Sequence, residues 1–165
     1  MQLISTHVQA QKNAPSQFEA LLGHHPQLGQ LYRTFYLNLT QDAKLDPRVV
    51  ELCRRRIAHI HNCRAELALT HPTQSFSAQE EFALEGGRYN GFTLPEQSAL
   101  QIAELISFNH HAISDGDVAR LQSHFGNDGT VTLLSALAFF DVMCRTKIAL
   151  NVDAQEGSLN SDYIA

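Results

Sequence analysis

The sequence predicts an all-α protein, a compact multi-helix bundle in one domain. Apolar residues recur at helical spacing in almost every segment, and no run of strict apolar and polar alternation is long enough to indicate a strand. A chain of 165 residues with 44% hydrophobic residues can bury a sizeable core in a single domain. We therefore expect one helical domain over residues 1–165, its core running from about residue 15 to about residue 152 between a polar N-terminal leader and a polar C-terminal tail.

Prolines mark the starts of the first two expected helices, over residues 15–22 and 26–39. The second helix has an apolar face that we expect to point inward, formed by Leu28, Leu31, Tyr32, Phe35, Tyr36 and Leu39.

Asp46 followed by Pro47 is a helix start signal, because an aspartate can cap the helix that a proline opens. The helix that follows should turn these residues inward: Val49, Val50, Cys53, Ile57 and Ile60. His61 and Asn62 interrupt it. We expect Asn62 to cap a further helix from Cys63 to about Thr70, which Pro72 limits.

Capping signals define the remaining helices. Ser77 and Glu80 fit a capping box for a helix that ends at Gly86 and Gly87. Pro95 opens a helix with an inward stripe of Ala99, Ile102, Ala103 and Ile106. Ser114 and Asp117 start one that Gly126 stops. The last helix, over about residues 128–150, is apolar on most of its circumference and should be central or at a subunit interface.

Composition narrows the classes of function. With 12 basic against 17 acidic residues and no long run of either, the chain has no electrostatic footprint for nucleic acid or an anionic membrane. Neither a secretory signal nor a transmembrane segment is expected. The cysteines, Cys53, Cys63 and Cys144, are odd in number and widely spaced, which argues against a disulfide framework and for the cytoplasm. Small molecules and protein partners remain, and we expect no cofactor.

The histidines and buried charges do not indicate a metal site. Nine histidines include no H-x-x-x-H pair, and His59, Cys63 and Glu66 would need helpful geometry to bind a metal, so we expect none. Asp141 inside the apolar last helix needs a partner, which Arg145 supplies one turn later.

The most informative stretch runs from Glu51 to Thr70. It resembles the alkylhydroperoxidase D and carboxymuconolactone decarboxylase superfamily, in which a helical glutamate is followed by a cysteine twelve positions later, a second cysteine three further on and a histidine four beyond that. Glu51 and Cys63 match, whereas Glu66 replaces the second cysteine and Thr70 the histidine. The order of the segments over residues 24–36, 45–63 and 113–126, with the late Arg145, is similar to that of peroxidase-related members.

The resemblance implies a helical homo-oligomer, a dimer, trimer or hexamer, but not a dithiol peroxidase. The family's attacking cysteine is the second of the pair, and a glutamate cannot form a sulfenic acid or a disulfide. The decarboxylase-like branch also places a glutamate at the position of Glu66. The resemblance thus implies an acid/base enzyme acting on a small carboxylated or carbonyl substrate. Glu51 and Glu66 would exchange protons with their pKa values pushed apart, and Cys63 would line the pocket.

Two alternatives remain open. Cys63, at a helix N-terminus beside Arg64, could be the thiol of a single-thiol redox or oxidant-response protein, with His59 as a base or proton relay. The chain could also be a non-catalytic oligomeric scaffold. Glu51 would then form an exposed ion pair with the neighbouring arginines, and Cys53 and Cys144 would be packing residues in either case.

Overall fold

The computed structural model describes residues 17–40, 44–71, 73–152 and 157–158, and it confirms the all-α fold. Its elements in chain order are α1 (Gln17–Leu22), α2 (Pro26–Thr40), α3 (Pro47–Ile60), α4 (Arg64–Leu67), β1 (Leu69–Thr70), α5 (Ala78–Gly86), α6 (Leu94–Phe108), the 3-10 helix η2 (His110–Ala112), α7 (Asp115–Ala149) and β2 (Gly157–Ser158). The N-terminal leader, and the prolines expected to open the first helix and to limit the helix after Cys63, lie outside the described residues.

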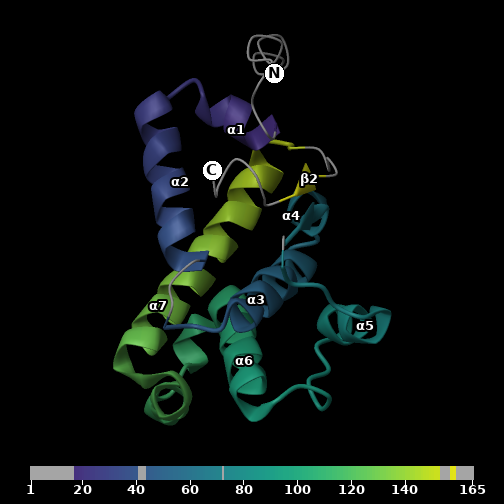
Figure 1. Cartoon of the computed structure of the whole chain (residues 1–165), viewed down its shortest axis with the longest axis vertical. Coiled ribbons are helices and arrows are strands. Elements are labelled where there is room, and N and C mark those ends of the chain that lie inside the picture. Colours follow the sequence, from purple (N-terminus) through teal and green to yellow (C-terminus); the bar gives the residue numbers. More distant parts are fainter. Residues whose placement is uncertain (1–16, 41–43, 72, 153–156, 159–165) are drawn as a thin grey trace.

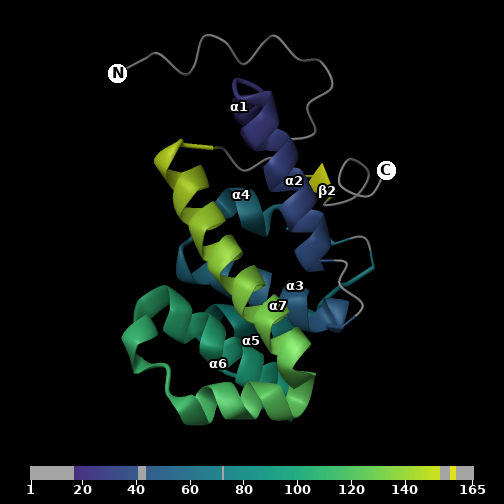
Figure 2. The ribbon, with the colours of Figure 1, turned by 90° about the vertical axis from the view of Figure 1, so that its left-hand side faces the viewer.

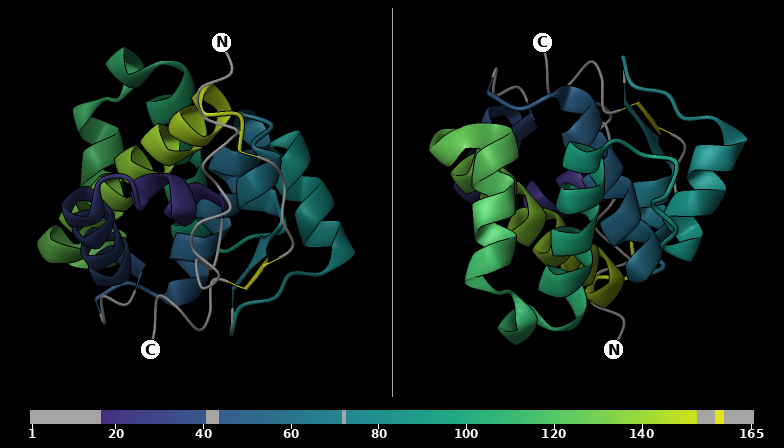
Figure 3. Two further views of the ribbon diagram at one scale, coloured as in Figure 1. Left: turned by 90° about the horizontal axis from the view of Figure 1, so that it is seen from above. Right: turned by 90° about the horizontal axis from the view of Figure 1, so that it is seen from below.

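Helix α7 runs diagonally along the molecule and is its central element (Figure 1). It packs against α3 and α6, which also pack against each other, and α2 covers another part of it. The view turned by 90° shows α7 crossing in front of α3 (Figure 2). Seen from either end, α5 lies at the edge of the molecule, separated from α7 by α3 (Figure 3). The last helix is therefore central, one of the two places expected for it.

Helix α3 begins where the sequence predicts. The Asp46 carboxylate accepts a hydrogen bond of 2.8 Å from the backbone N–H of Arg48, and Pro47 occupies the first turn. The helix buries apolar side chains as expected, except that Ile60 is only half-buried, and it also buries Glu51, Arg54 and Arg56. Charged residues of this helix thus lie inside the bundle.

The segment after α3 differs from the prediction. Asn62 adopts a left-handed backbone with φ of 50°, and Cys63, not Asn62, occupies the cap position of α4. Helix α4 ends at Leu67, and the next residues form β1, which pairs in parallel with β2. A pairing with residues near the end of the chain draws the backbone of β1 out of the helix, which local sequence signals do not reveal.

Helix starts after residue 70 follow the predicted caps. Capping boxes are present at Ser77 with Glu80 and at Ser114 with Asp117, and a third joins Thr93 with Glu96. Gly126 has φ of 68° and ψ of −180° and divides α7 into two helical stretches, as its predicted role as a stop requires.

The apolar face predicted for α2 is only partly buried. Tyr36 and Leu39 are buried, but Leu28, Leu31 and Phe35 are exposed, Leu31 at 68%. In the part of the chain that the structure describes, no helix has the length and apolarity to cross a membrane.

Candidate functional site

Arg54 is the centre of a buried ionic cluster. Its Nε and Nη2 donate to the two carboxylate oxygens of Glu51 at 2.7 Å each, and its Nη1 donates to Oε2 of Glu66 at 2.7 Å. The remaining bonds go to the carbonyls of Glu66 at 2.8 Å and Leu69 at 3.1 Å. A guanidinium has five N–H donors, so Arg54, only 1% exposed, is fully satisfied.

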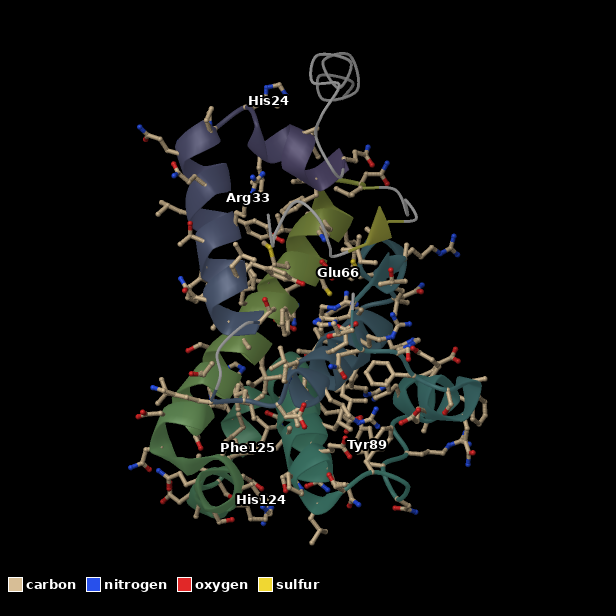
Figure 4. All side chains as sticks on the ribbon, in the orientation of Figure 1. His24, Arg33, Glu66, Tyr89, His124 and Phe125 are labelled. Carbon is tan, nitrogen blue, oxygen red and sulfur yellow. The ribbon has the colours of Figure 1, made fainter. Side chains whose placement is uncertain are left out.

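Lys147 of α7 completes the cluster. Its ammonium pairs with Oε1 of Glu66 and lies 5.1 Å from the ring centroid of Phe18. Burial raises the pKa of Glu66, but the Lys147 and Arg54 cations outweigh it and bring that pKa down to about 2. The cluster thus contains two carboxylates and two cations, and Glu66 lies where α4 and α7 come together (Figure 4).

Two further side chains border this cluster. Tyr36 of α2 is buried, and its pKa is raised by burial and by the Glu66 and Glu51 carboxylates, against the effect of Arg54. His71 follows β1. Burial lowers its pKa, with opposing influences from Glu51 and Arg54, and its Nδ1 accepts hydrogen bonds from the backbone N–H groups of residues 73 and 74. The neutral His71 ring therefore carries its proton on Nε2.

The thiols of Cys63 and Cys144 lie beside the same cluster, and each is the largest influence on the pKa of the other. Each residue is 1% exposed. The pKa of Cys63 falls to about 7, chiefly because of the Cys144 thiol; the backbone N–H of Glu66 and the Lys147 cation also lower it, against burial and the Glu66 carboxylate. The pKa of Cys144 is raised by the Cys63 thiol and by burial.

The positions of the two cysteines explain which thiol is more acidic. Cys63 occupies the cap position of α4, at the N-terminal end of that helix and near Lys147, whereas Cys144 lies inside α7, where backbone N–H groups are already used. Cys63 is therefore the more acidic thiol of the pair.

Of the four predicted site residues, the structure brings Glu51, Cys63 and Glu66 to one place but not His59. The His59 ring contacts Glu81 of α5, with 3.6 Å between Nε2 and Oε2. The chain turns at His61 and Asn62, so Cys63 does not continue the helical face on which His59 lies. The structure therefore places His59 against Glu81 and not beside Cys63, the thiol that it could have served as a base or proton relay. Within the described ranges, no three His, Cys, Asp or Glu side chains are grouped as metal ligands.

The expected acid/base pair also differs from the observed one. The sequence suggested two carboxyls in an apolar pocket with diverging pKa values, but Arg54 lies between Glu51 and Glu66 and binds both. With a pKa of about 2, Glu66 is ionised at neutral pH and cannot donate a proton there.

Other predictions for single residues hold. Arg145 pairs with Asp141 at 2.8 Å, and the His61 ring adds a contact of 2.6 Å to the same carboxylate. Cys53 is a buried packing residue on α3, and its pKa is raised by burial and by Glu96.

Lys147, Cys144 and Tyr36 were not predicted as site residues. A charged residue inside an otherwise apolar helix is the signal that singled out Asp141. The same signal at Lys147 would have predicted a buried partner. Cys144 precedes Lys147 by three residues and shares its helix face. Tyr36 carries no comparable signal.

Comparison with known proteins agrees with this fold. The structure is similar to the crystal structure of an uncharacterized peroxidase-related protein from Silicibacter sp. TM1040, with a TM-score of 0.70, 16% sequence identity, and coverage of 84% of this chain and 75% of that chain. No family model and no curated protein matches the sequence. The chain therefore shares the helical fold of that peroxidase-related protein.

Proposed function

We propose that this protein is a thiol redox protein of the alkylhydroperoxidase D-like superfamily and that Cys63 reacts with hydroperoxides. The observation that carries the proposal is the Cys63 thiol at the start of α4, whose pKa the neighbouring Cys144 thiol and the Lys147 cation bring to about 7. About half of Cys63 is then thiolate at neutral pH, and the thiolate is the form that attacks an oxidant.

The reaction begins with attack of the Cys63 sulfur on one peroxide oxygen. The S–O bond forms while the O–O bond breaks, which leaves Cys63 as a sulfenic acid and releases an alcohol, or water from hydrogen peroxide, once the departing oxygen takes a proton. Because the thiol is buried, small hydroperoxides that enter through local opening of the fold are the expected substrates.

The resemblance around Glu51 and Cys63 and the peroxidase-related fold both support this proposal. It departs from the family pattern in the attacking residue, since Cys63 occupies the first cysteine position and Glu66 the second. A cytoplasmic location, a homo-oligomer and a small-molecule substrate stay predictions.

Thiol titration tests the proposal. We expect iodoacetamide to alkylate one cysteine of the native protein with an apparent pKa of about 7, and dimedone to trap a sulfenic acid on the same residue after hydrogen peroxide. Mass spectrometry should assign both to Cys63, and Cys63→Ser should abolish them. Cys53→Ser, which removes another buried thiol, is the matched control and should keep both. Unchanged labelling in Cys63→Ser, or a titration near the usual thiol value of about 8.5, would contradict the proposal.

The second candidate is the acid/base enzyme of the decarboxylase-like branch, acting on a small carboxylated or carbonyl substrate. The convergence of Glu51 and Glu66 on one guanidinium favours it, because displacement of either carboxylate would free Arg54 to bind a substrate carboxylate. The ionised state of Glu66 counts against it. Release of CO₂ from a β-keto acid that is lost in Glu51→Gln and kept in Cys63→Ser would favour this candidate over the redox function.

A further inference from the structure

We propose that Cys144 is the resolving cysteine of this protein, and that oxidation joins it to Cys63 in a disulfide between the start of α4 and α7. The inference rests on the proposed function, because Cys63 must first become a sulfenic acid. It revises the expectation that the chain cannot run a dithiol cycle, which considered only cysteines one helical turn apart.

Proximity of the two thiols is the first observation. Both are buried in the same apolar core, and each thiol is the largest influence on the pKa of the other. A sulfenic acid formed on Cys63 would therefore appear beside a second thiol that is shielded from solvent. Cys53, in contrast, is packed on α3, and its pKa is raised by burial and by Glu96.

The second observation is the ion pair between α4 and α7. Glu66 binds Lys147, and each of these residues follows one of the two cysteines by three positions, Glu66 after Cys63 and Lys147 after Cys144. The ion pair thus joins the two segments one helical turn beyond the thiols and holds the thiols near each other. Arg54 holds the other oxygen of Glu66 in place from α3.

The ion pair with Lys147 gives a role to Glu66. In the resembling family that position carries the second sulfur, but here it carries an anion that binds α7 through Lys147. The chain thus loses the local cysteine and positions one from a distant helix instead, which makes Glu66 a positioning residue for the thiol pair.

The proposed step is balanced. The Cys144 sulfur attacks the sulfenic sulfur of Cys63, the S–S bond forms, the S–O bond breaks, and the hydroxyl leaves as water with the Cys144 proton. Over both steps two thiols lose two electrons and one hydroperoxide is reduced to an alcohol and water. A dithiol reductant resets the protein by thiol–disulfide exchange and becomes a disulfide itself.

Peptide mapping of the full-length protein tests the inference without any substitution. After reduction and addition of one equivalent of hydrogen peroxide, we expect non-reducing digestion to yield a peptide that links Cys63 to Cys144 and to leave the thiol of Cys53 free. Cys53→Ser should form the same link. Cys144→Ser should stop at the sulfenic acid and give several-fold more dimedone adduct on Cys63 than the wild type, which consumes its sulfenic acid.

The outcomes separate the two proposals. An absence of oxidation at Cys63 would overturn both. Equal dimedone adduct on Cys63 in wild type and Cys144→Ser, with no linked peptide, would overturn the role of Cys144 and leave the proposed function standing. A link from Cys63 to Cys53 would overturn it in the same way.

Discussion

Glu66 has a structural role at the position where the resembling family has its second cysteine. A carboxylate there cannot attack a peroxide, but both of its oxygens accept bonds from buried cations, one on α3 and one on α7. A buried anion with complete partners is tolerated, whereas removal of either cation would leave an uncompensated charge. The position therefore constrains three elements at once.

The lowered pKa of Glu66 predicts how stability depends on pH. Its folded value of about 2 lies below its ordinary value of 4.5, so its contribution is complete above about pH 4.5 and is lost as the pH falls toward 2. The shift corresponds to about 3 kcal/mol of unfolding free energy. In urea titrations from about pH 7 to about pH 3, wild type should lose stability and Glu66→Gln should lack this part of the loss.

The control for this experiment is Glu85→Gln on the exposed side of α5. It leaves Glu66 and both cations in place and should retain the wild-type pH dependence. An equal slope for Glu66→Gln and wild type would show that the carboxylate contributes nothing to acid stability.

Helix α7 depends on the single break at Gly126. A φ of 68° combined with a ψ of −180° belongs to a region that essentially only glycine adopts. The break lets the first stretch of α7 turn away, so that the second stretch, with Cys144 and Lys147, runs through the middle of the bundle (Figure 1).

Replacement of Gly126 isolates this backbone effect. A Cβ at Gly126 would meet no atom within 4 Å, so Gly126→Ala should lose about 1–3 kcal/mol through backbone strain alone. Gly116→Ala, in the first turn of α7, also has room and should be neutral or stabilising by up to about 1 kcal/mol. Urea unfolding measures both, and equal stabilities of the two variants would refute the strain argument.

Elements differ in how far the sequence predicts them. The helix starts at Asp46, Ser77 and Ser114 depend on side chains within three residues of the cap, so local reasoning finds them. The end of α4 depends on pairing with β2 and was missed for that reason. The outward face of Leu31 was also missed, because periodicity defines an apolar stripe but not what covers it.

The residues of the candidate site also differ in how far the sequence predicts them. Glu51, Cys63 and Glu66 belong to one short stretch, so their convergence could be predicted from spacing. Cys144 and Lys147 join them only because α7 crosses α4 in one particular register, and spacing along a single helix does not specify which helix faces it. The ionised state of Glu66 depends on Lys147 from that same packing and on Arg54, which α3 places beside α4 and β1.

At the scale of the whole molecule, the similarity to a peroxidase-related protein at 16% identity concerns the arrangement of helices. A shared fold leaves the chemistry to the side chains at the site. The proposed disulfide would be a feature of this arrangement as a whole, because it would enclose α5, α6 and most of α7 in one loop.

The proposed cross-link predicts a difference in stability between the oxidised and the reduced protein. Closing a loop of about 80 residues restricts the unfolded chain and should stabilise the fold by about 4 kcal/mol. Urea unfolding after peroxide treatment should therefore give a higher midpoint than unfolding in dithiothreitol. Cys144→Ser should unfold at one midpoint under both conditions, and a wild type that did the same while carrying the link would contradict the prediction.

The crossing of α4 and α7 also determines how strong a reductant is needed to convert the proposed disulfide back to two thiols. Folding and disulfide formation belong to one thermodynamic cycle. The free energy by which the disulfide stabilises the folded chain therefore equals the free energy by which folding stabilises the disulfide against reduction. About 4 kcal/mol corresponds to a reduction potential about 90 mV more negative in the folded chain than in the unfolded one. A reductant too weak to act on the native protein would then open the disulfide once the helices separate, so the packing of the bundle selects the partner that can return it to the dithiol state.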